Sequence, residues 1–337
     1  MKNRFGPREL SGAFGDIGTL IPFVIGYIAV VGVNPTGILL SFGIFMIIAG
    51  IRFKTPFPVQ PMKAIGATAI ASAGAVTPGM VHSAGLFSGL FWLAIGASGA
   101  LKWIAKITAK PVVLGVTLGL GFSFMLQGIG FMQQGFALPY GIWRDLSVVQ
   151  IGFTMPEFAL RGITWQDMLT GIFLLALPQI PLTLGNAVIG TAAEQKRAFP
   201  ENPISEKRVA IFKGIMNLGA PIIGGVPMCN GASGIAAHTR FGGKTGGTMI
   251  IIGGILLVLG LFFSASVLTI FTAIPPAVLG GILFVTGLSL AMAARDIGSD
   301  RRDFSVMLLV AGLSLWNVGA GFLAGLIAYR ILRHFGG

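Results

Sequence analysis

Long apolar stretches, broken by Gly, Pro and a few polar side chains, dominate the hydropathy pattern of this chain. A membrane-spanning helix needs about 20 mostly apolar residues. Two segments, 61–76 and 230–240, are too polar and too rich in small residues for continuous spans, and each follows an extended Pro-containing run. We therefore expect an all-α polytopic membrane protein of about 12 membrane elements, two of them broken. Continuous spans are predicted over 11–32, 35–51, 84–101, 111–131, 169–192, 209–224, 247–265, 275–293, 303–317 and 318–332.

Composition supports this class. Hydrophobic residues make up 54% of the 337 residues and charged residues only 10%, against about 25% charged in a soluble domain. The 51 glycines follow no triplet period, which excludes a collagen. The single cysteine, Cys229, excludes a disulfide framework and a Cys-ligated metal site, and three scattered histidines lack metal-ligand spacing. We expect no metal and no cofactor.

The charge distribution predicts the orientation in the membrane. The chain carries 23 Lys and Arg against 11 Asp and Glu, and cytoplasmic loops are enriched in basic residues. With the N-terminus inside, every basic residue but three lies on the cytoplasmic side, Lys213 included. The exceptions are Arg144 and Arg161, which lie outside, and Lys63, which lies within the membrane. We expect an inner-membrane protein with both termini cytoplasmic. Because the basic excess sets topology, nucleic acid is excluded as a partner, while membrane lipid surrounds the protein.

Three pairs of sequence landmarks occur in the same order in the two halves. FGDIGTLIP at 14–22 corresponds to LPQIPLTLGN at 177–186, QPMKA at 60–64 to VPMCN at 226–230, and PVVLG at 111–115 to PAVLG at 276–280. An odd number of elements before the connecting loop makes the two units inverted, as in many transporters. The predicted division is a first repeat over 1–131, an extracytoplasmic loop over 132–167 and a second repeat over 168–337, with no soluble regulatory domain.

The two broken helices predict an anion site. One begins near Pro61 and the other near Pro227 or Met228, so their N-termini face one another at the midplane. Unpaired N–H groups and the positive end of the helix dipole attract anions. Irregular backbone at this depth is tolerated where it lines a cavity or is buried in protein.

Two charged residues are expected inside the membrane. Lys63 lies in the first turn of a broken helix, where a cation is unfavourable unless an anion is bound. Its alternative role is to pair with Asp16 or to reach the membrane surface. Asp16 lies near the same depth and would repel an oxyanion unless it is protonated or paired. It is therefore a proton-coupling group or the structural partner of Lys63.

Neutral polar residues at the same depth complete the predicted site. Each serves either as a direct contact or as a hydrogen-bonding residue between helices. Met62, Met228 and Cys229 serve as packing residues or through their backbone. A Gly-x-x-x-Gly pair, Gly115 and Gly119, indicates only close helix approach. The predicted substrate-binding residues are Lys63, Gln60, Pro61, Met62, Thr19, Gln179, Thr183, Asn186 and Asn230.

The landmark sequences resemble a known family. FGDIGTLIP at 14–22 and PVQPMKAI at 58–65 closely resemble two signature stretches of the molybdate transporters related to the SulP sulfate permeases, and LPQIPLTLGN at 177–186 is similar to a third. The resemblance implies a secondary transporter of tetrahedral oxyanions, with inverted repeats split into a core and a gate. It departs from the SulP-like pattern of seven elements per half, because we count five before the loop at 132–167 and seven after it.

The combined prediction is molybdate uptake by alternating access, with protons as the candidate coupling ion. A sulfate transporter on the same scaffold and an anion channel remain as alternatives, since sulfate and molybdate share shape and charge. An enzyme is not expected, because the membrane elements hold no carboxylate pair, His cluster or nucleophile–base pair. A homodimer stays open at this stage.

Overall fold

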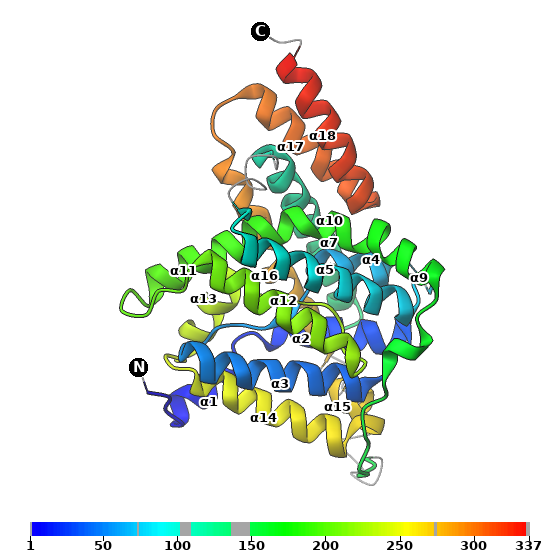
Figure 1. Cartoon of the computed structure of the whole chain (residues 1–337), viewed down its shortest axis with the longest axis vertical. Helices are drawn as coiled ribbons and strands as arrows, with labels where there is room; N and C mark the ends of the chain where they lie inside the picture. The colour runs from blue at the N-terminus through cyan, green and yellow to red at the C-terminus, as the bar shows by residue number, and fades with distance from the viewer. Residues whose placement is uncertain (1, 73, 102–108, 136–148, 273–274, 335–337) are drawn as a thin grey trace.

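The structure, a computed structural model, describes residues 2–72, 74–101, 109–135, 149–272 and 275–334, and they are largely helical (Figure 1). The first half contains α1 (Pro7–Ala13), α2 (Ile17–Gly26) continued by the π-helical turn η1 (Tyr27–Val31), α3 (Pro35–Phe53), β1 (Gln60–Pro61), α4 (Lys63–Ala71), α5 (Pro78–Ser98) and α7 (Lys110–Gln133). The second half contains η3 (Ala159–Gly162), α9 (Trp165–Thr170), η4 (Gly171–Ala176), α10 (Leu177–Leu182), η5 (Thr183–Gly190), α11 (Thr191–Ala198), α12 (Glu206–Ile222), β2 (Met228–Cys229), α13 (Ala232–Arg240), α14 (Gly247–Phe262), η6 (Ser264–Ser266), α15 (Val267–Thr272), α16 (Pro276–Ala291), η7 (Met292–Ile297), α17 (Arg301–Trp316) and α18 (Val318–His334).

Local sequence signals set where several helices begin. The Asn34 side chain accepts a hydrogen bond from Thr36 N at 2.9 Å, and Pro35 fills the first position of α3. The Thr77 hydroxyl caps α5 in the same way, with Pro78 following it. Such caps satisfy free N–H groups, and proline has none to satisfy at this position.

One continuous helix of 34 residues runs from Trp165 to Ala198 and contains two π-helical segments, η4 and η5. They flank α10, which contains Pro178 and Pro181. Proline cannot donate the usual backbone hydrogen bond and crowds the preceding turn, so the helix changes its hydrogen-bonding pattern on both sides. π-helical insertions are frequent at functional sites.

The predicted number of spans is not confirmed. Among the described residues, four helices are long and apolar enough to cross a membrane: α3, α5, α7 and Trp165–Ala198. Two bent pairs, Pro7–Ala13 with Ile17–Val31 and Gly247–Phe262 with Ser264–Phe271, raise this number to six. Helices α12, α16, α17 and α18 have 16 or 17 residues. At 1.5 Å per residue they fall short of a hydrocarbon core about 30 Å thick.

Large apolar side chains are exposed on the outer faces of the helices. This distribution is unusual for a soluble monomer and fits a protein surrounded by lipid. Examples are Ile48 on α3, Leu90 on α5, Leu126 on α7, Val258 on α14, Leu308 on α17 and Leu323 on α18.

The two broken elements are confirmed, with a correction to where their helices begin. Strands β1 and β2 pair antiparallel in the register Gln60 with Cys229 and Pro61 with Met228. Helix α4 starts at Lys63, two residues after Pro61. Helix α13 starts at Ala232, beyond the predicted Pro227 or Met228, because 228–229 pair with β1 and Gly231 is still extended with φ −151°.

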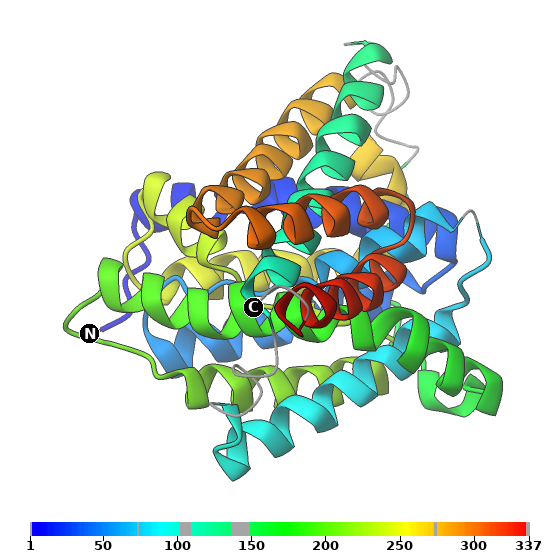
Figure 2. The ribbon, with the colours of Figure 1, turned by 90° about the horizontal axis from the view of Figure 1, so that it is seen from above.

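Helices α7, α16, α17 and α18 pack against one another as a four-helix group; α17 and α18 protrude at the top of the molecule in Figure 1, and Figure 2 shows the group from above. Glycines allow its helices to approach closely. A methyl group added at Gly121 would lie 2.7 Å from the Gly287 carbonyl oxygen, and one at Gly128 would lie 2.6 Å from that of Gly280. Gly115, part of the predicted Gly-x-x-x-Gly pair, likewise faces Met307 of α17.

Part of the predicted loop at 132–167 lies outside the described residues, including Arg144. From 149 to 164 the chain holds the short helix η3 and no helix long enough to cross a membrane, while α7 ends at Gln133 and the 34-residue helix begins at Trp165, both just inside the predicted bounds of the loop. Backbone hydrogen bonds from Gly152 to Phe262 and from Thr154 to Leu261, at 2.9 and 2.8 Å, fix this segment to the end of α14.

Candidate anion-binding site

The strand pair joins the two segments that lead into α4 and α13. Besides the register described above, Met62 N donates to Pro227 O at 2.9 Å, and Asn230 Nδ2 donates to Pro58 O at 2.8 Å. These contacts join segments more than 160 residues apart in sequence, all of them buried. The two broken elements therefore form one rigid junction in the interior of the protein.

Gln179 of α10 caps α4. Its Oε1 accepts hydrogen bonds from Ala64 N at 2.8 Å and from Ile65 N at 3.3 Å, while its Nε2 donates to Thr183 Oγ1 at 3.0 Å. All three contacts are buried. The amide thus occupies two N–H groups of the first turn of α4, and both predicted site residues Gln179 and Thr183 have partners within the protein.

Lys63 is the first residue of α4 and its side chain is only 3% exposed. Its ammonium nitrogen has no hydrogen-bond partner in the part of the chain that the structure describes. Its electrostatic neighbours are Asp16 and Cys229. A buried ammonium group is costly unless it is paired and hydrogen-bonded, so this atom lacks the partner that a bound anion would supply.

Asp16 does not act as a direct ion-pair partner of Lys63. Within the described residues no ion pair of 4 Å or less joins the two side chains, and Asp16 Oδ2 instead accepts a hydrogen bond from Gln60 Nε2. Asp16 is half-buried at the start of α2. Together with Gln60 and His238 it lines a cavity of about 10 Å³, close to the space that one water molecule needs.

The Gln60 side chain also lies against the N-terminus of α13. A methyl group added at Gly231 would come within 2.7 Å of Gln60 Oε1, and one at Gly234 within 2.7 Å of Gln60 Nε2. A side chain at either position would displace the Gln60 amide, and at Gly234 it would also meet Pro58 Cβ at 2.6 Å. Gln60 therefore links Asp16 to the start of α13.

The remaining predicted residues lie in or near the same region. Asn230 is fully buried, and its Oδ1 has no partner among the described residues. Met62 is buried at the N-cap of α4, directly after Pro61 of β1. Thr19 is buried on α2 one turn after Asp16, and Asn186 is half-buried in η5.

Two residues of α12 were not predicted as part of this region. Lys213, assigned by sequence to the cytoplasmic side, is 0% exposed and donates to Cys229 Sγ at 3.2 Å. Asn217, one turn later, bonds both Met228 N and Met228 O at 2.7 Å. The signal was present, because both polar residues fall four apart inside the predicted apolar span 209–224.

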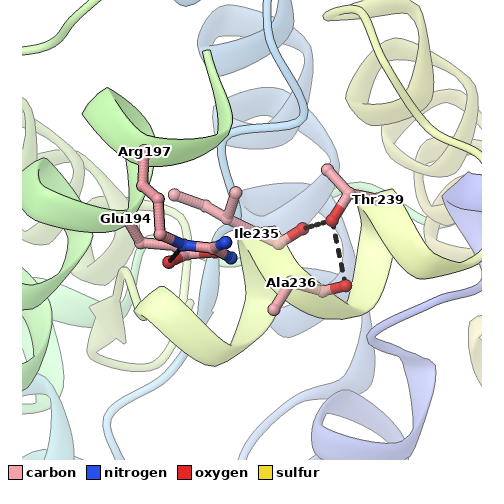
Figure 3. A network of polar contacts seen from close by, with 5 residues as sticks. All are labelled: Glu194, Arg197, Ile235, Ala236 and Thr239. Atoms are coloured by element: carbon pink, nitrogen blue, oxygen red, sulfur yellow. Dashed lines mark hydrogen bonds and ion pairs between the residues drawn. The ribbon is translucent and has the colours of Figure 1, made fainter. Parts of the chain in front are cut away.

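Polar contacts away from the strand pair are of another kind. Figure 3 shows the ion pair between Arg197 and Glu194 of α11 beside α13, where the Thr239 hydroxyl donates to Ile235 O and Ala236 O at 2.8 and 3.0 Å. The Arg197 side chain is exposed, and an exposed pair contributes little to stability. The described residues contain no group of three His, Cys, Asp or Glu that could hold a metal ion.

Comparison with known proteins identifies the family. The model of the family described as a molybdate transporter of the MFS superfamily matches residues 8–124 and 171–290, more than half of the chain. This chain belongs to the molybdate transporter family. The matched ranges contain all the site residues predicted from the sequence of this molybdate transporter family member. They also contain Lys213 and Asn217. They leave out the connecting segment, α17 and α18.

Sequence alignments with two plant and algal molybdate transporters cover almost the whole chain. Molybdate transporter 2 of Arabidopsis thaliana is 29% identical, in an alignment that covers 96% of this chain and 87% of that protein. Molybdate transporter 1 of Chlamydomonas reinhardtii is 25% identical, covering 98% of this chain and 92% of that protein.

Solved structures with low sequence identity share the fold. The transmembrane domain of the cyanobacterial bicarbonate transporter BicA matches with a TM-score of 0.59 at 15% identity and covers 98% of both chains. The murine anion transporter Slc26a9, in its inward-facing state, matches with a TM-score of 0.64 at 12% identity, covering 100% of this chain and 69% of that one. The predicted SulP-like inverted-repeat fold class is confirmed, and family and fold together support an anion transporter.

Proposed function

We propose that this chain is a secondary active transporter that takes up molybdate by alternating access. The observation that carries this proposal is the buried ammonium of Lys63 at the start of α4, which has no hydrogen-bond partner among the described residues. A tetrahedral dianion supplies both the missing charge and the missing acceptors. Membership of the molybdate transporter family favours molybdate over sulfate as that dianion.

In the proposed binding mode, the dianion lies between the N-termini of α4 and α13 and pairs with Lys63. Gln60 and Asn230 orient it from the two strands. Gln179 and Thr183 hold the first turn of α4 in place, which keeps Lys63 and the Met62 backbone at a fixed position. Thr19 and Asn186 face the substrate from α2 and η5, and Pro61 fixes the backbone where β1 ends.

The motion that we propose is a movement of the four-helix group α7, α16, α17 and α18 against the remaining helices. The reciprocal glycine contacts between α7 and α16 favour movement of this group as one body. The strand junction holds α4 and α13 together, so the substrate site stays intact while its access changes sides. This arrangement corresponds to a gate and a core in alternating access.

Protons are the proposed coupling ion, and Asp16 is the group that binds them. Its carboxylate accepts a hydrogen bond from Gln60, whose side chain lies against the start of α13. The charge of Asp16 therefore acts on an anion bound there. When Asp16 is ionised it opposes anion binding, and protonation removes that opposition. Asp16→Asn should transport without dependence on a proton gradient, whereas unchanged gradient dependence in this variant would exclude Asp16 as the coupling group.

The proposed membrane arrangement is an inner-membrane protein with cytoplasmic termini, lipid around its outer faces and inverted repeats over 1–131 and 168–337. The exposed side chains of Lys54, Lys207 and Lys244 fit a basic cytoplasmic surface. Labelling of single cysteines at these positions from the inside only, in a Cys229→Ala background, is the expected result. A homodimer is part of the proposal, and the mass of the detergent-solubilised protein tests it.

Uptake of radiolabelled molybdate into proteoliposomes tests the function. Wild-type protein should accumulate the label with saturating kinetics, and unlabelled molybdate should compete better than sulfate. Lys63→Ala should lose uptake, while Lys196→Ala, which removes an exposed lysine of α11, should keep it. Size-exclusion chromatography of both variants confirms that they fold.

Each of the other outcomes has a distinct meaning. If sulfate competes as well as molybdate or better, the molybdate assignment is refuted in favour of a sulfate transporter. A flux that never saturates would indicate an anion channel. Normal uptake by Lys63→Ala would refute the site, whatever the substrate.

A further inference from the structure

A second buried lysine lies close to the strand junction, on α12. Lys213 of α12 is fully buried and contacts no carboxylate within 4 Å among the described residues. Its ammonium nitrogen donates to Cys229 Sγ at 3.2 Å. A thiol is a weak acceptor, so Lys213, like Lys63, has no strong anionic partner in the part of the chain that the structure describes.

Polar contacts lead from Lys213 to the start of α13. The Cys229 thiol donates in turn to Asn230 O at 3.2 Å, and the Asn230 side chain retains a buried oxygen with no partner in the described ranges. Cys229 is also an electrostatic neighbour of Lys63. The two lysines therefore approach the same strand residue from different helices.

While Asp16 is ionised, charge balance requires more than Lys63. The N-terminus of a helix is equivalent to about half a positive charge, so two helix ends and Lys63 supply roughly two positive charges, and an ionised Asp16 removes one of them. A dianion would then remain incompletely neutralised in a medium where an uncompensated charge is costly. One further cation restores the balance.

We propose that Lys213 is the second counter-charge of the anion site, and that it selects dianions over monoanions of the same shape. This inference rests on the proposed function, because it concerns the same site. Lys213 acts through space and through the Cys229 and Asn230 contacts, and Asn217 holds β2 at the distance from α12 that this requires.

A lysine that acts as a counter-charge and one that only supports the fold have different effects on anion affinity when they are removed. Coulomb energy is proportional to the charge of the ligand. Removing one cation therefore weakens binding of a dianion by twice the logarithmic factor that it weakens binding of a monoanion. A lysine that only supports the fold would instead weaken both anions by the same factor.

Tungstate and perrhenate, two tetrahedral oxyanions that differ by one charge, are the probes. Their inhibition constants are measured against radiolabelled molybdate uptake for wild type, Lys213→Met, Lys213→Gln and Lys213→Arg, with Lys207→Met as the control at an exposed position of the same helix. Where a variant binds anions without transporting them, thermal stabilisation of the detergent-solubilised protein by each anion gives its dissociation constant instead.

We expect Lys213→Met and Lys213→Gln to lose affinity for tungstate by on the order of 100-fold and for perrhenate by on the order of tenfold. Lys213→Arg and Lys207→Met should keep the wild-type ratio. Equal losses for the two anions, or no loss, would overturn the proposal. Should neither neutral variant fold, equal affinity of wild type for the two anions would also overturn it. Absence of oxyanion uptake by wild type would instead refute the proposed function.

Discussion

Gly253 and Gly254 are neighbours on α14, yet alanine should have opposite effects at the two positions. A methyl group added at Gly253 would lie 2.7 Å from the Gly43 carbonyl oxygen and 2.8 Å from Ile47 Cγ1 of α3. At Gly254, among the described residues, no atom outside the neighbouring backbone of α14 lies within 4 Å of the added group. The substitution is chemically the same, so the difference isolates the contact between α3 and α14.

The magnitude follows from these distances. An ordinary van der Waals contact begins at 3.4 Å, so α3 and α14 must separate at Gly253 by several tenths of an ångström. Overpacking of this kind costs about 1–3 kcal/mol, whereas replacing glycine inside a helix by alanine gains about 0.5–1 kcal/mol. We expect Gly253→Ala to destabilise the protein by about 1–2 kcal/mol and Gly254→Ala to stabilise it by up to about 1 kcal/mol.

Thermal unfolding of the two variants in the same detergent measures the difference. The transition of Gly253→Ala should fall by a few degrees and that of Gly254→Ala should rise or stay unchanged. Equal shifts for the two variants, or a higher transition for Gly253→Ala, would refute the close packing of α3 against α14.

Three further substitutions test individual contacts. Gln179→Leu leaves two buried N–H groups of α4 without an acceptor and should lower stability by about 2–4 kcal/mol and reduce uptake; unchanged uptake would show that the cap is dispensable. Asn217→Leu leaves both backbone groups of Met228 unpaired and should destabilise by a similar amount, about 2–4 kcal/mol in chemical unfolding; unchanged stability would show that pairing with β1 alone holds β2. Glu9→Ala removes the buried carboxylate that accepts hydrogen bonds from the Thr245 backbone and the Thr248 hydroxyl, and should speed proteolysis of the N-terminal segment, which a rate equal to wild type would contradict.

Much of the fold followed from simple signals. Apolar stretches of about 20 residues indicated the helices, and the Pro-rich runs before 61 and 228 indicated the two broken elements. The predicted spans 303–317 and 318–332 agree with α17 and α18 to within two residues. The predicted number of spans was not confirmed, since several apolar stretches end as helices too short to cross a membrane alone.

The buried position of Lys63 could be predicted, because the residue lies in an apolar stretch at an expected helix start, where a cation is costly. The cap by Gln179 could not, since it joins residues 115 apart in sequence and depends on how α10 packs beside α4. No local pattern distinguishes an amide that caps a helix from one that binds a ligand.

Lys213 was misassigned for a definite physical reason. Counting basic residues by side of the membrane assigns each lysine near a helix end to a loop, but Lys213 lies eight residues inside α12. Its spacing of four from Asn217 places both on one face of that helix. Two polar residues on one face of an apolar helix indicate a buried polar contact, which the structure contains.

The most direct test of the account is the position of the bound anion. Molybdenum scatters X-rays anomalously, so diffraction data from crystals of the protein grown with molybdate, collected at the molybdenum edge, locate the ion without prior assumptions. We expect one peak between the N-termini of α4 and α13, roughly 4 Å from Lys63 Nζ, because a molybdate oxygen lies between the metal and the ammonium group. A peak elsewhere in the protein, with none beside Lys63, would contradict the proposed site.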